Sequence, residues 1–371
     1  MFKMRSSIKK WAAATLAMVF AVSMAGCGGN QSTPGSSQAG GAAKIGVVSY
    51  LTGGGAAYGE AIKQGLELAR DEINAQGKVK LELVFEDSKG DKNEAINATT
   101  TLSGEMFAVG PIASQAGVPI MGTSTTAEGI TEIGDYVFRN ALPESLAIPH
   151  AVKKAKEKLG LKKVAIMYSN NNDWAVSGFK TFEQSIKDNG MEAVTVETFA
   201  DKDTDFSAQL TKIAALKPDA IMVAGLYQEA ALILKKAREI GITVPIVGNN
   251  GFNSPQLIKA GGNASEGVVV ASPWFPGKDD EKVKKFVTAY KAKYGKEPDQ
   301  FAAQSYDALY IMADALEKAG TTTDRKKLRD NLANVKDFPG VTGKFAFDAK
   351  RNPAMDVTIL VVKGGQFTEL K

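Results

Sequence analysis

Residues 44–87 read KIGVVSYLTGGGAAYGEAIKQGLELARDEINAQGKVKLELVFED, and this stretch decides the fold. Its apolar, β-rich runs at 45–50 and 79–85 are predicted strands, whereas 59–75 repeats apolar residues at the spacing of one helix face. A strand, an amphipathic helix and a second strand make the unit from which doubly wound parallel sheets are built. The stretch therefore predicts an α/β fold.

The same alternation continues toward the C-terminus. Further strands are expected at 118–121, 164–168, 192–197, 220–224, 245–248, 267–271, 343–347 and 357–362. Helices are expected at 174–189, 206–216, 228–240, 253–260, 279–294 and 300–319. One place breaks the rhythm, because only 106–109 looks like a strand between 85 and 118. A parallel sheet needs a strand between consecutive crossover helices, so either 106–109 is a short strand or one strand is missing.

Residues 1–26 have the pattern of an export signal. Lys3, Arg5, Lys9 and Lys10 precede an apolar run that is too short to span a bilayer, and small residues end at Gly26. With Cys27 next, the pattern resembles a bacterial lipobox, which implies cleavage before Cys27 and lipidation of its thiol. Residues 27–43, rich in Gly and Ser, would form a flexible tether. The alternative is an ordinary secretory signal with an incidental cysteine. Either signal predicts an extracytoplasmic location in the cell envelope.

Composition excludes several classes of function. The leader holds four of the 45 lysines and arginines and none of the 41 acidic residues, so the rest of the chain is formally neutral and shows no nucleic-acid footprint. His150 is the only histidine and is expected at the surface or a hinge, and Cys27 is the only cysteine. No metal site, cofactor or enzymatic nucleophile is therefore predicted. The glycine-rich 52–59 fits no nucleotide motif and is expected to be a turn lining a ligand cleft.

Hydroxyl side chains follow predicted strands, where open α/β sheets bind ligands. Ser124, Thr125 and Thr126 come after the strand at 118–121, and Ser103 opens a helical stretch. Hydroxyls and free N–H groups at a helix start can hold a carboxylate. Helix capping alone is the alternative role for residues 124–126, and the two roles are compatible.

Segments spread along the whole of 44–371 resemble the branched-chain amino-acid (leucine/isoleucine/valine) binding proteins of ABC importers, of the type I periplasmic-binding-protein class. The segments that carry the resemblance, in order, are Leu51-Thr52-Gly53, Glu72-Ile73-Asn74-Ala75, Ala116-Gly117-Val118-Pro119-Ile120, Asp205-Phe206-Ser207, Lys217-Pro218-Asp219-Ala220-Ile221, Glu266-Gly267-Val268 and Tyr306-Asp307-Ala308-Leu309. The resemblance implies two doubly wound parallel-sheet lobes joined by three chain crossings that act as a hinge. The implied lobes are 44–141 with 273–347, and 142–272 with 348–371.

The resemblance also implies a binding site between the lobes. Ser103, Ser124 and Thr126 match positions that bind the carboxylate and help to orient the amine of an amino acid. Tyr58, Trp174 and Phe301 match positions that line the side-chain pocket, and a further family tyrosine falls at Leu226 or Tyr227. The implied protein is a monomer that delivers its solute to the membrane permease and ATPase subunits of an importer.

The chain departs from the family pattern at Asn250, where relatives carry the acidic residue that receives the ligand's ammonium group. An amide offers no charge, which leaves amides, urea-like solutes and aromatic acids open as ligands. Glu229 could supply a carboxylate, but an exposed position on its helix is the favoured expectation.

The second departure is the break after 85, where Leu102 runs directly into Ser103-Gly104 and about fifteen residues of the family pattern are absent. One alignment makes 99–117 a continuous helix. The rival makes 106–109 the strand and moves the binding serine to Ser114. The favoured function is a lipid-anchored solute-binding protein of an importer; a sensory subunit without transport and, less favoured, an envelope enzyme are the alternatives.

Overall fold

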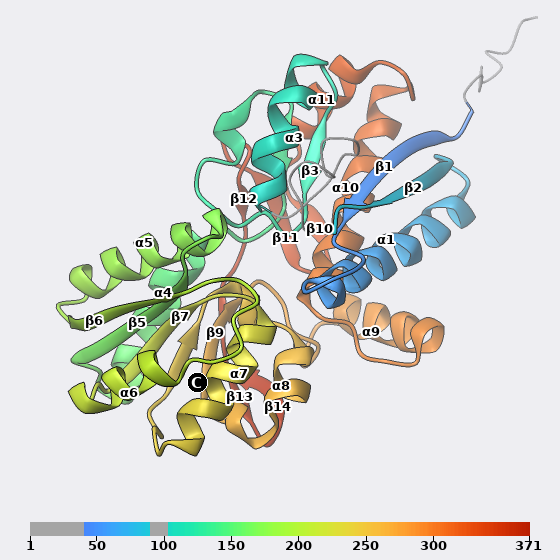
Figure 1. Ribbon diagram of the computed structural model, residues 1–371. Coiled ribbons are helices and arrows are strands. Elements are labelled where there is room, and N and C mark those ends of the chain that lie inside the picture. The colour runs from blue at the N-terminus through green and yellow to red at the C-terminus, as the bar shows by residue number, and fades with distance from the viewer. Residues whose placement is uncertain (1–40, 90–102) are drawn as a thin grey trace, which may run out of the picture. The chain divides into compact units, whose positions relative to one another are not determined.

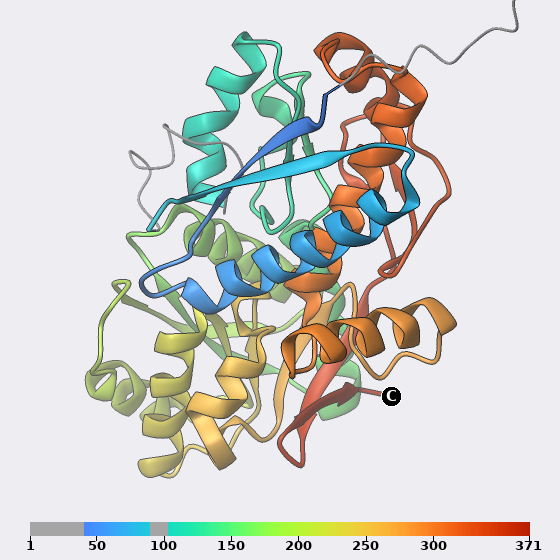
Figure 2. The same cartoon turned by 90° about the vertical axis from the view of Figure 1, so that its right-hand side faces the viewer.

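The computed structural model describes residues 41–89 and 103–371, all of which belong to one compact unit, Gly40–Lys371. The opening unit is confirmed: β1 (Ala43–Ser49) pairs in parallel with β2 (Leu81–Asp87), and α1 (Ala56–Gln76) connects them (Figures 1 and 2). Its apolar stripe, which includes Ile62, Leu66 and Ile73, is buried. The apolar face of α1 thus covers the strands β1 and β2, and its burial stabilises this strand-helix-strand unit.

The largest sheet has seven strands in the order β14-β13-β9-β8-β7-β5-β6. Five of them run in parallel: β5 (Lys163–Ser169), β6 (Glu192–Phe199), β7 (Ala220–Ala224), β8 (Ile246–Gly248) and β9 (Val268–Ser272). This sheet confirms the predicted α/β class with parallel strands, and two further strands complete it: β13 (Thr358–Lys363) is antiparallel to β9, and β14 (Gln366–Glu369) is antiparallel to β13. A hairpin places these last strands at the sheet edge, where antiparallel pairing is common.

Helices cover both faces of this sheet (Figure 1). Val164 and Ile166 of β5 pack with α4 (Glu144–Leu159) and α5 (Asp173–Asp188), whereas Ala165 and Met167 face a second core. That core includes side chains of α6 (Ser207–Leu216), α7 (Tyr227–Glu239) and α8 (Pro255–Gly261). Alternate residues of a strand point to opposite faces, so a strand buried on both sides is apolar throughout.

The remaining long helices pack around strands β1 and β2 and helix α1. They are α9 (Glu281–Tyr294), α10 (Gln300–Ala319) and α11 (Arg325–Ala333). Helices α1 and α10 approach closely at Gly65, because a Cβ built there would lie 2.2 Å from the carbonyl oxygen of Ala302. Only glycine permits this contact of two backbones.

Several short elements complete the fold. They are β3 (Ile120–Gly122), β4 (Val137–Arg139), β10 (Phe338–Gly340), β11 (Gly343–Phe347), β12 (Pro353–Ala354) and the 3₁₀ turns η1 (Thr131–Ile133), η2 (Asn250–Phe252) and η3 (Gly262–Ser265). Strands β3 and β4 form a separate parallel pair, and β10, β11 and β12 form an antiparallel sheet. None of the described helices is both long and apolar enough to cross a membrane.

The break in the strand rhythm is a helix. Residues 106–109 lie in α3 (Ser103–Gln115), so their assignment as a strand, in the rival alignment, is wrong. Met106, Val109 and Ala113 are buried at helical spacing, and Ile112 on the opposite face is 47% exposed. Positions 99–102 of the expected helix lie outside the described residues. Within the described residues, no strand joins the pair β1-β2 to the pair β3-β4.

A buried carboxyl group lies at the start of α4. Glu144 has no solvent exposure, its N–H donates to the carbonyl of Thr126 (2.8 Å), and neither carboxyl oxygen has a hydrogen-bond partner among the described residues. Gly178 makes room for it, because a Cβ there would lie 2.9 Å from Oε2 of Glu144 and 3.2 Å from Nδ2 of Asn249. Desolvation raises the pKa of Glu144 from 4.5 to about 8.

This pKa predicts how stability changes with pH. The folded protein holds the proton of Glu144 more tightly than the unfolded chain, so its stabilising effect is complete below pH 4.5 and is lost as the pH rises toward 8. Glu144→Gln removes the titration. From pH 5 to pH 8, we expect the wild type to lose about 3–4 kcal/mol of unfolding free energy relative to this variant.

Urea unfolding at both pH values measures the difference. Glu157→Gln, at an exposed glutamate on the same helix, is the matched control and should follow the wild type. Parallel pH profiles for the wild type and Glu144→Gln would show that Glu144 does not titrate in this range.

Candidate functional site

A small cavity of about 170 Å³ lies where the sheet strands end. Its walls come from segments that follow β1, β5, β6, β7 and β8 and from the first residues of α3 and α10. It is lined by Tyr50, Tyr58, Ser103, Glu105, Ser124, Asn171, Asn172, Asp173, Trp174, Asp201, Leu226, Asn250, Gly251 and Phe301. Binding sites of open α/β sheets occur at the carboxyl ends of strands. The volume is below the range of drug-sized pockets and suits a small solute.

Most residues expected at the site meet in this cavity. Seven of them line it: Tyr58, Ser103, Ser124, Trp174, Leu226, Asn250 and Phe301. Thr126 and Tyr227 lie directly behind it. The hydroxyl of Thr126 accepts a hydrogen bond from Nε1 of Trp174 (2.6 Å), and the N–H of Tyr227 donates to the hydroxyl of Tyr58 (2.9 Å).

Aromatic side chains form one wall. The ring centroid of Tyr58 lies 4.8 Å from that of Phe301 and 5.2 Å from that of Tyr227. The hydroxyl of Tyr58 also donates to the carbonyl of Gly251 (2.7 Å), and burial raises its pKa, so it stays neutral and keeps its proton. Trp174 is held at the start of α5, where Oδ1 of Asn172 accepts a hydrogen bond from the backbone N–H of Trp174 (3.1 Å). These rings give an apolar surface with fixed geometry.

Hydroxyl groups and a helix start form a polar wall. The described part of α3 starts at Ser103, and the hydroxyl oxygen of Ser103 accepts the N–H of Ala127 (3.2 Å). Ser124 and Thr126 do not cap a helix, because the next helical turn, η1, begins at Thr131. The capping role considered for residues 124–126 is therefore wrong. The hydroxyl of Ser103 and the N-terminal end of α3 are suited to a carboxylate.

Asn250 lines the cavity, but its side-chain oxygen is already used. Oδ1 accepts a hydrogen bond from Nε2 of Gln300 (2.6 Å), and Gln300 is buried at the start of α10. The amide therefore joins η2 to α10 and leaves its N–H₂ group for other contacts.

Three carboxylates at the cavity were missed by the sequence analysis: Glu105, Asp173 and Asp201. Asp201 follows β6, and its oxygens accept from Ser169 Oγ (2.5 Å) and Asn172 Nδ2 (2.8 Å). The pKa of Tyr50 is raised, first by burial and also by the nearby charges of Asp201 and Glu105. A signal was available, because Asp173 and Asp201 lie just beyond predicted strand ends.

Two other expectations have clear outcomes. Glu229 was expected to be exposed, which is wrong: it is 5% exposed, because its Oε1 accepts the N–H of Lys202 (2.8 Å). His150 is exposed on α4, where its Nδ1 lies 2.7 Å from the carbonyl of Leu146, and it does not line the cavity.

In the described ranges, no group of three or more potential metal ligands was found.

Comparison with known proteins identifies the family. Residues 42–366 match the periplasmic binding protein family. The chain is 26% identical over 327 residues to the Leu/Ile/Val-binding protein BraC3 of Rhizobium johnstonii, covering 82% of this chain and 86% of that protein.

Solved structures agree as well. The branched-chain amino acid transporter substrate binding protein LivJ of Streptococcus pneumoniae, in complex with isoleucine, is 35% identical with a TM-score of 0.82, and the match covers 88% of this chain and 98% of that one. An ABC-transporter solute binding protein from R. palustris, in complex with benzoate, is 26% identical with a TM-score of 0.81, covering 89% and 96%. This chain belongs to the periplasmic binding protein family and is a solute-binding protein of an ABC transporter, not an enzyme.

Proposed function

We propose that the protein captures a small amino acid of branched-chain or apolar type. The observation that carries this proposal is the cavity itself, which sets aromatic rings against hydroxyls, a helix start and carboxylates within about 170 Å³. An apolar side chain would pack on Tyr58, Trp174 and Phe301. The Leu/Ile/Val-binding relative and the isoleucine complex of LivJ support the same class of solute.

The two charged ends of an amino acid would bind at different places. Its carboxylate would lie at the start of α3, against Ser103 and Ser124, with Thr126 behind them. Its ammonium group needs a negative partner. Because Oδ1 of Asn250 already accepts from Gln300, we assign that partner to the carboxylates around Asp201 and Asp173.

Capture would use two lobes, 44–141 with 273–347 and 142–272 with 348–371. Asn250 and Trp174 come from the second range, whereas Tyr58, Ser103 and Phe301 come from the first. A hinge motion that separates these walls would open the site, and the solute would hold them together. The closed protein would then deliver its solute to the permease and ATPase subunits.

An aromatic acid is the second candidate. The uncharged Asn250 favours it, since a benzoate-like ligand has no ammonium group to satisfy. The benzoate complex of the R. palustris protein supports a ligand of this type in a related site.

Calorimetry on protein lacking residues 1–27 separates the candidates. We expect leucine, isoleucine or valine to bind with Kd at or below the order of 10 µM, and benzoate at least about tenfold more weakly. Leucine without its amine, 4-methylpentanoate, should also bind at least about tenfold more weakly, because the carboxylates of the cavity would lose their partner. Tighter binding of benzoate than of leucine would favour the second candidate. No binding of any of these solutes by folded protein would contradict both.

Asn250→Asp tests the missing charge. The new carboxylate can still accept the hydrogen bond from Gln300 and adds a negative group at the cavity wall. We expect about tenfold tighter leucine binding, since charge-assisted hydrogen bonds are roughly twice as strong as neutral ones. Binding of 4-methylpentanoate should weaken. Asn263→Asp, at an exposed asparagine in η3, is the matched control and should change neither affinity. Equal effects on both ligands would show that Asn250 does not limit recognition of the ammonium group.

We also propose that Cys27 carries the lipid anchor. In cells that make the full chain, labelled palmitate should be incorporated into the wild type, which should sediment with membranes. Cys27→Ala should lose the label and move to the soluble fraction, because two acyl chains are what hold such a protein stably. Ser32→Ala in the tether is the control and should behave like the wild type. A labelled Cys27→Ala protein would place the lipid elsewhere.

A further inference from the structure

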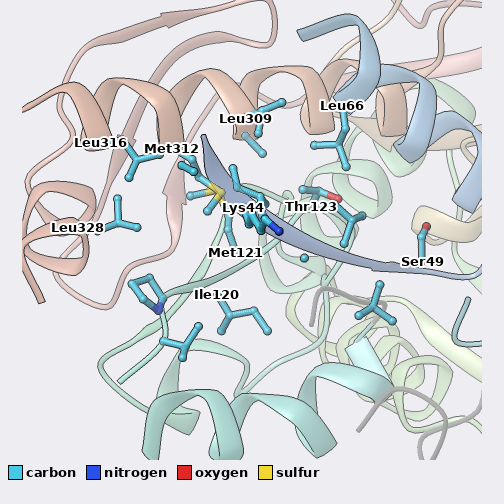
Figure 3. A pocket seen from close by; sticks show the side chains of 18 of the residues that line it. Lys44, Ser49, Leu66, Ile120, Met121, Thr123, Leu309, Met312, Leu316 and Leu328 are labelled. Carbon is cyan, nitrogen blue, oxygen red and sulfur yellow. The ribbon is translucent and has the colours of Figure 1, made fainter. Parts of the chain in front are cut away.

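Residues 123–127 follow β3, are buried, and lie outside the helices and strands named above. We call them the polar loop. Figure 3 shows where the loop begins: the chain passes from Ile120 and Met121 of β3 to Thr123, beside a larger cavity of about 650 Å³. Backbone groups of a buried loop need partners from elsewhere, because no helix or strand ladder satisfies them. The side chains that supply those partners therefore decide where the loop lies.

The polar loop forms part of the wall of the solute cavity and holds other parts of it. Ser124 lines the cavity directly. The hydroxyl of Thr126 accepts the indole N–H of Trp174 (2.6 Å), and the N–H of Ala127 donates to the hydroxyl oxygen of Ser103 (3.2 Å). Trp174 and Ser103 both line the cavity. A shift of the loop would therefore displace the polar wall and one aromatic ring together.

One charged side chain binds the backbone of this loop. Arg139, the last residue of β4, is 3% exposed, and its Nη1 donates to the carbonyls of Thr125 (3.1 Å) and Ala127 (2.6 Å). The carbonyl between them, that of Thr126, accepts the backbone N–H of Glu144 (2.8 Å). Three successive carbonyls of the loop are thus satisfied, two of them by Arg139. Loss of the guanidinium would leave both buried and unpaired, which is unfavourable.

The same guanidinium reaches a segment far away in the sequence. Nε of Arg139 donates to Oδ1 of Asn352 (2.7 Å), just before β12. Asn352 is held in turn by Asp348, because its N–H donates to the carboxylate (2.8 Å) and its carbonyl accepts the N–H of Asp348 (2.8 Å). Arg139 and Asn352 each lie close to a boundary of the proposed lobes. Arg139 therefore joins the polar loop to the segment 348–352, where the chain would pass from one lobe to the other.

The charge of Arg139 suits an anionic solute. Burial lowers its pKa to about 10, so the group is still charged at neutral pH, and the charges of Glu128, Glu132 and Asp348 favour the charged form. Within the described ranges, the oxygens that accept its hydrogen bonds are uncharged, since they belong to two carbonyls and an amide. A buried cation beside the polar loop attracts a carboxylate bound there.

We propose that Arg139 is a positioning residue for the carboxylate side of the solute cavity. It does not touch the solute. It fixes the polar loop through two carbonyls, and through Asn352 it ties this loop to the segment 348–352. The inference rests on the proposed function only in requiring a solute with a carboxylate, so it holds for leucine and for benzoate alike.

Arg139→Gln and Arg139→Lys test this role in calorimetry with leucine, or with benzoate if that acid binds more tightly. Neither replacement can bind two carbonyls of the loop and Asn352 together. We expect the Kd to rise at least about tenfold in Arg139→Gln and about threefold in Arg139→Lys, which keeps the charge. Cooperative urea unfolding shows which variants are folded, and Arg139→Lys carries the comparison if Arg139→Gln is not.

Arg351→Gln is the matched control. Arg351 is also partly buried and donates to the carbonyls of Val137 (3.0 Å) and Thr131 (2.6 Å), and among the described residues none of its acceptors lies in the polar loop. This variant should lose stability, whereas its Kd should stay within about twofold of the wild type.

Asn352→Ala separates positioning from a general loss of stability. Asn352 does not line the solute cavity and contacts the guanidinium of Arg139, so its effect on binding should pass through that group. We expect this change to raise the Kd about threefold in the wild type, and by less than about 1.5-fold in a folded Arg139 variant, because coupled residues are not additive.

Three results would overturn the proposal: a Kd unchanged in the folded Arg139 variants, an equal loss of affinity in Arg351→Gln, or effects of Asn352→Ala and the Arg139 variants that simply multiply. Wild-type protein that binds neither leucine nor benzoate would contradict the proposed function together with this inference. Wild-type binding of either acid, with unchanged affinity in the folded Arg139 variants, would contradict this inference alone.

Discussion

Two hydrogen bonds through the hydroxyl of Tyr58 hold together the segments that form the solute cavity. This group accepts from the N–H of Tyr227, after β7, and donates to the carbonyl of Gly251, after β8. Tyr58 itself is 2% exposed near the start of α1. Leaving a buried N–H or carbonyl without a partner costs free energy, so this one side chain fixes the distance between α1 and two strand ends. The aromatic wall, and with it the apolar side of the cavity, depends on that spacing.

Much of the fold could be predicted from the sequence because hydrophobic periodicity is local. The strand at 220–224 and the helix at 300–319 were predicted with their observed bounds, since a doubly buried strand and a long amphipathic helix give strong patterns. Strands β4 and β12, of three and two residues, carry no such pattern and were missed. Residues 106–109 were ambiguous because a short apolar run fits a strand or a buried helix, and only the burial of Ala113 one turn later decides it.

The candidate site could be predicted only in part. The positions of Tyr58, Trp174 and Phe301 follow from where strands end and helices begin, and these residues do line one cavity. The pairing of Asn250 with Gln300, the burial of Glu144 behind Asn249 and the burial of Glu229 depend on residues far apart in the chain. No local pattern encodes such contacts. Asp173 and Asp201 could have been suspected from their places after predicted strands, but only the fold shows that both line the same cavity.

The pairing of β13 with β9 has a consequence for folding of the protein. Thr358 lies opposite Ser272, and β14 is added outside β13, so this edge of the sheet comes from residues about ninety positions beyond β9. Contacts between such distant positions form slowly, because a long loop must close first. Until β13 docks, the apolar edge of β9 is uncovered and open to wrong partners. Docking of the hairpin formed by β13 and β14 is thus the step that completes this sheet and covers the edge of β9.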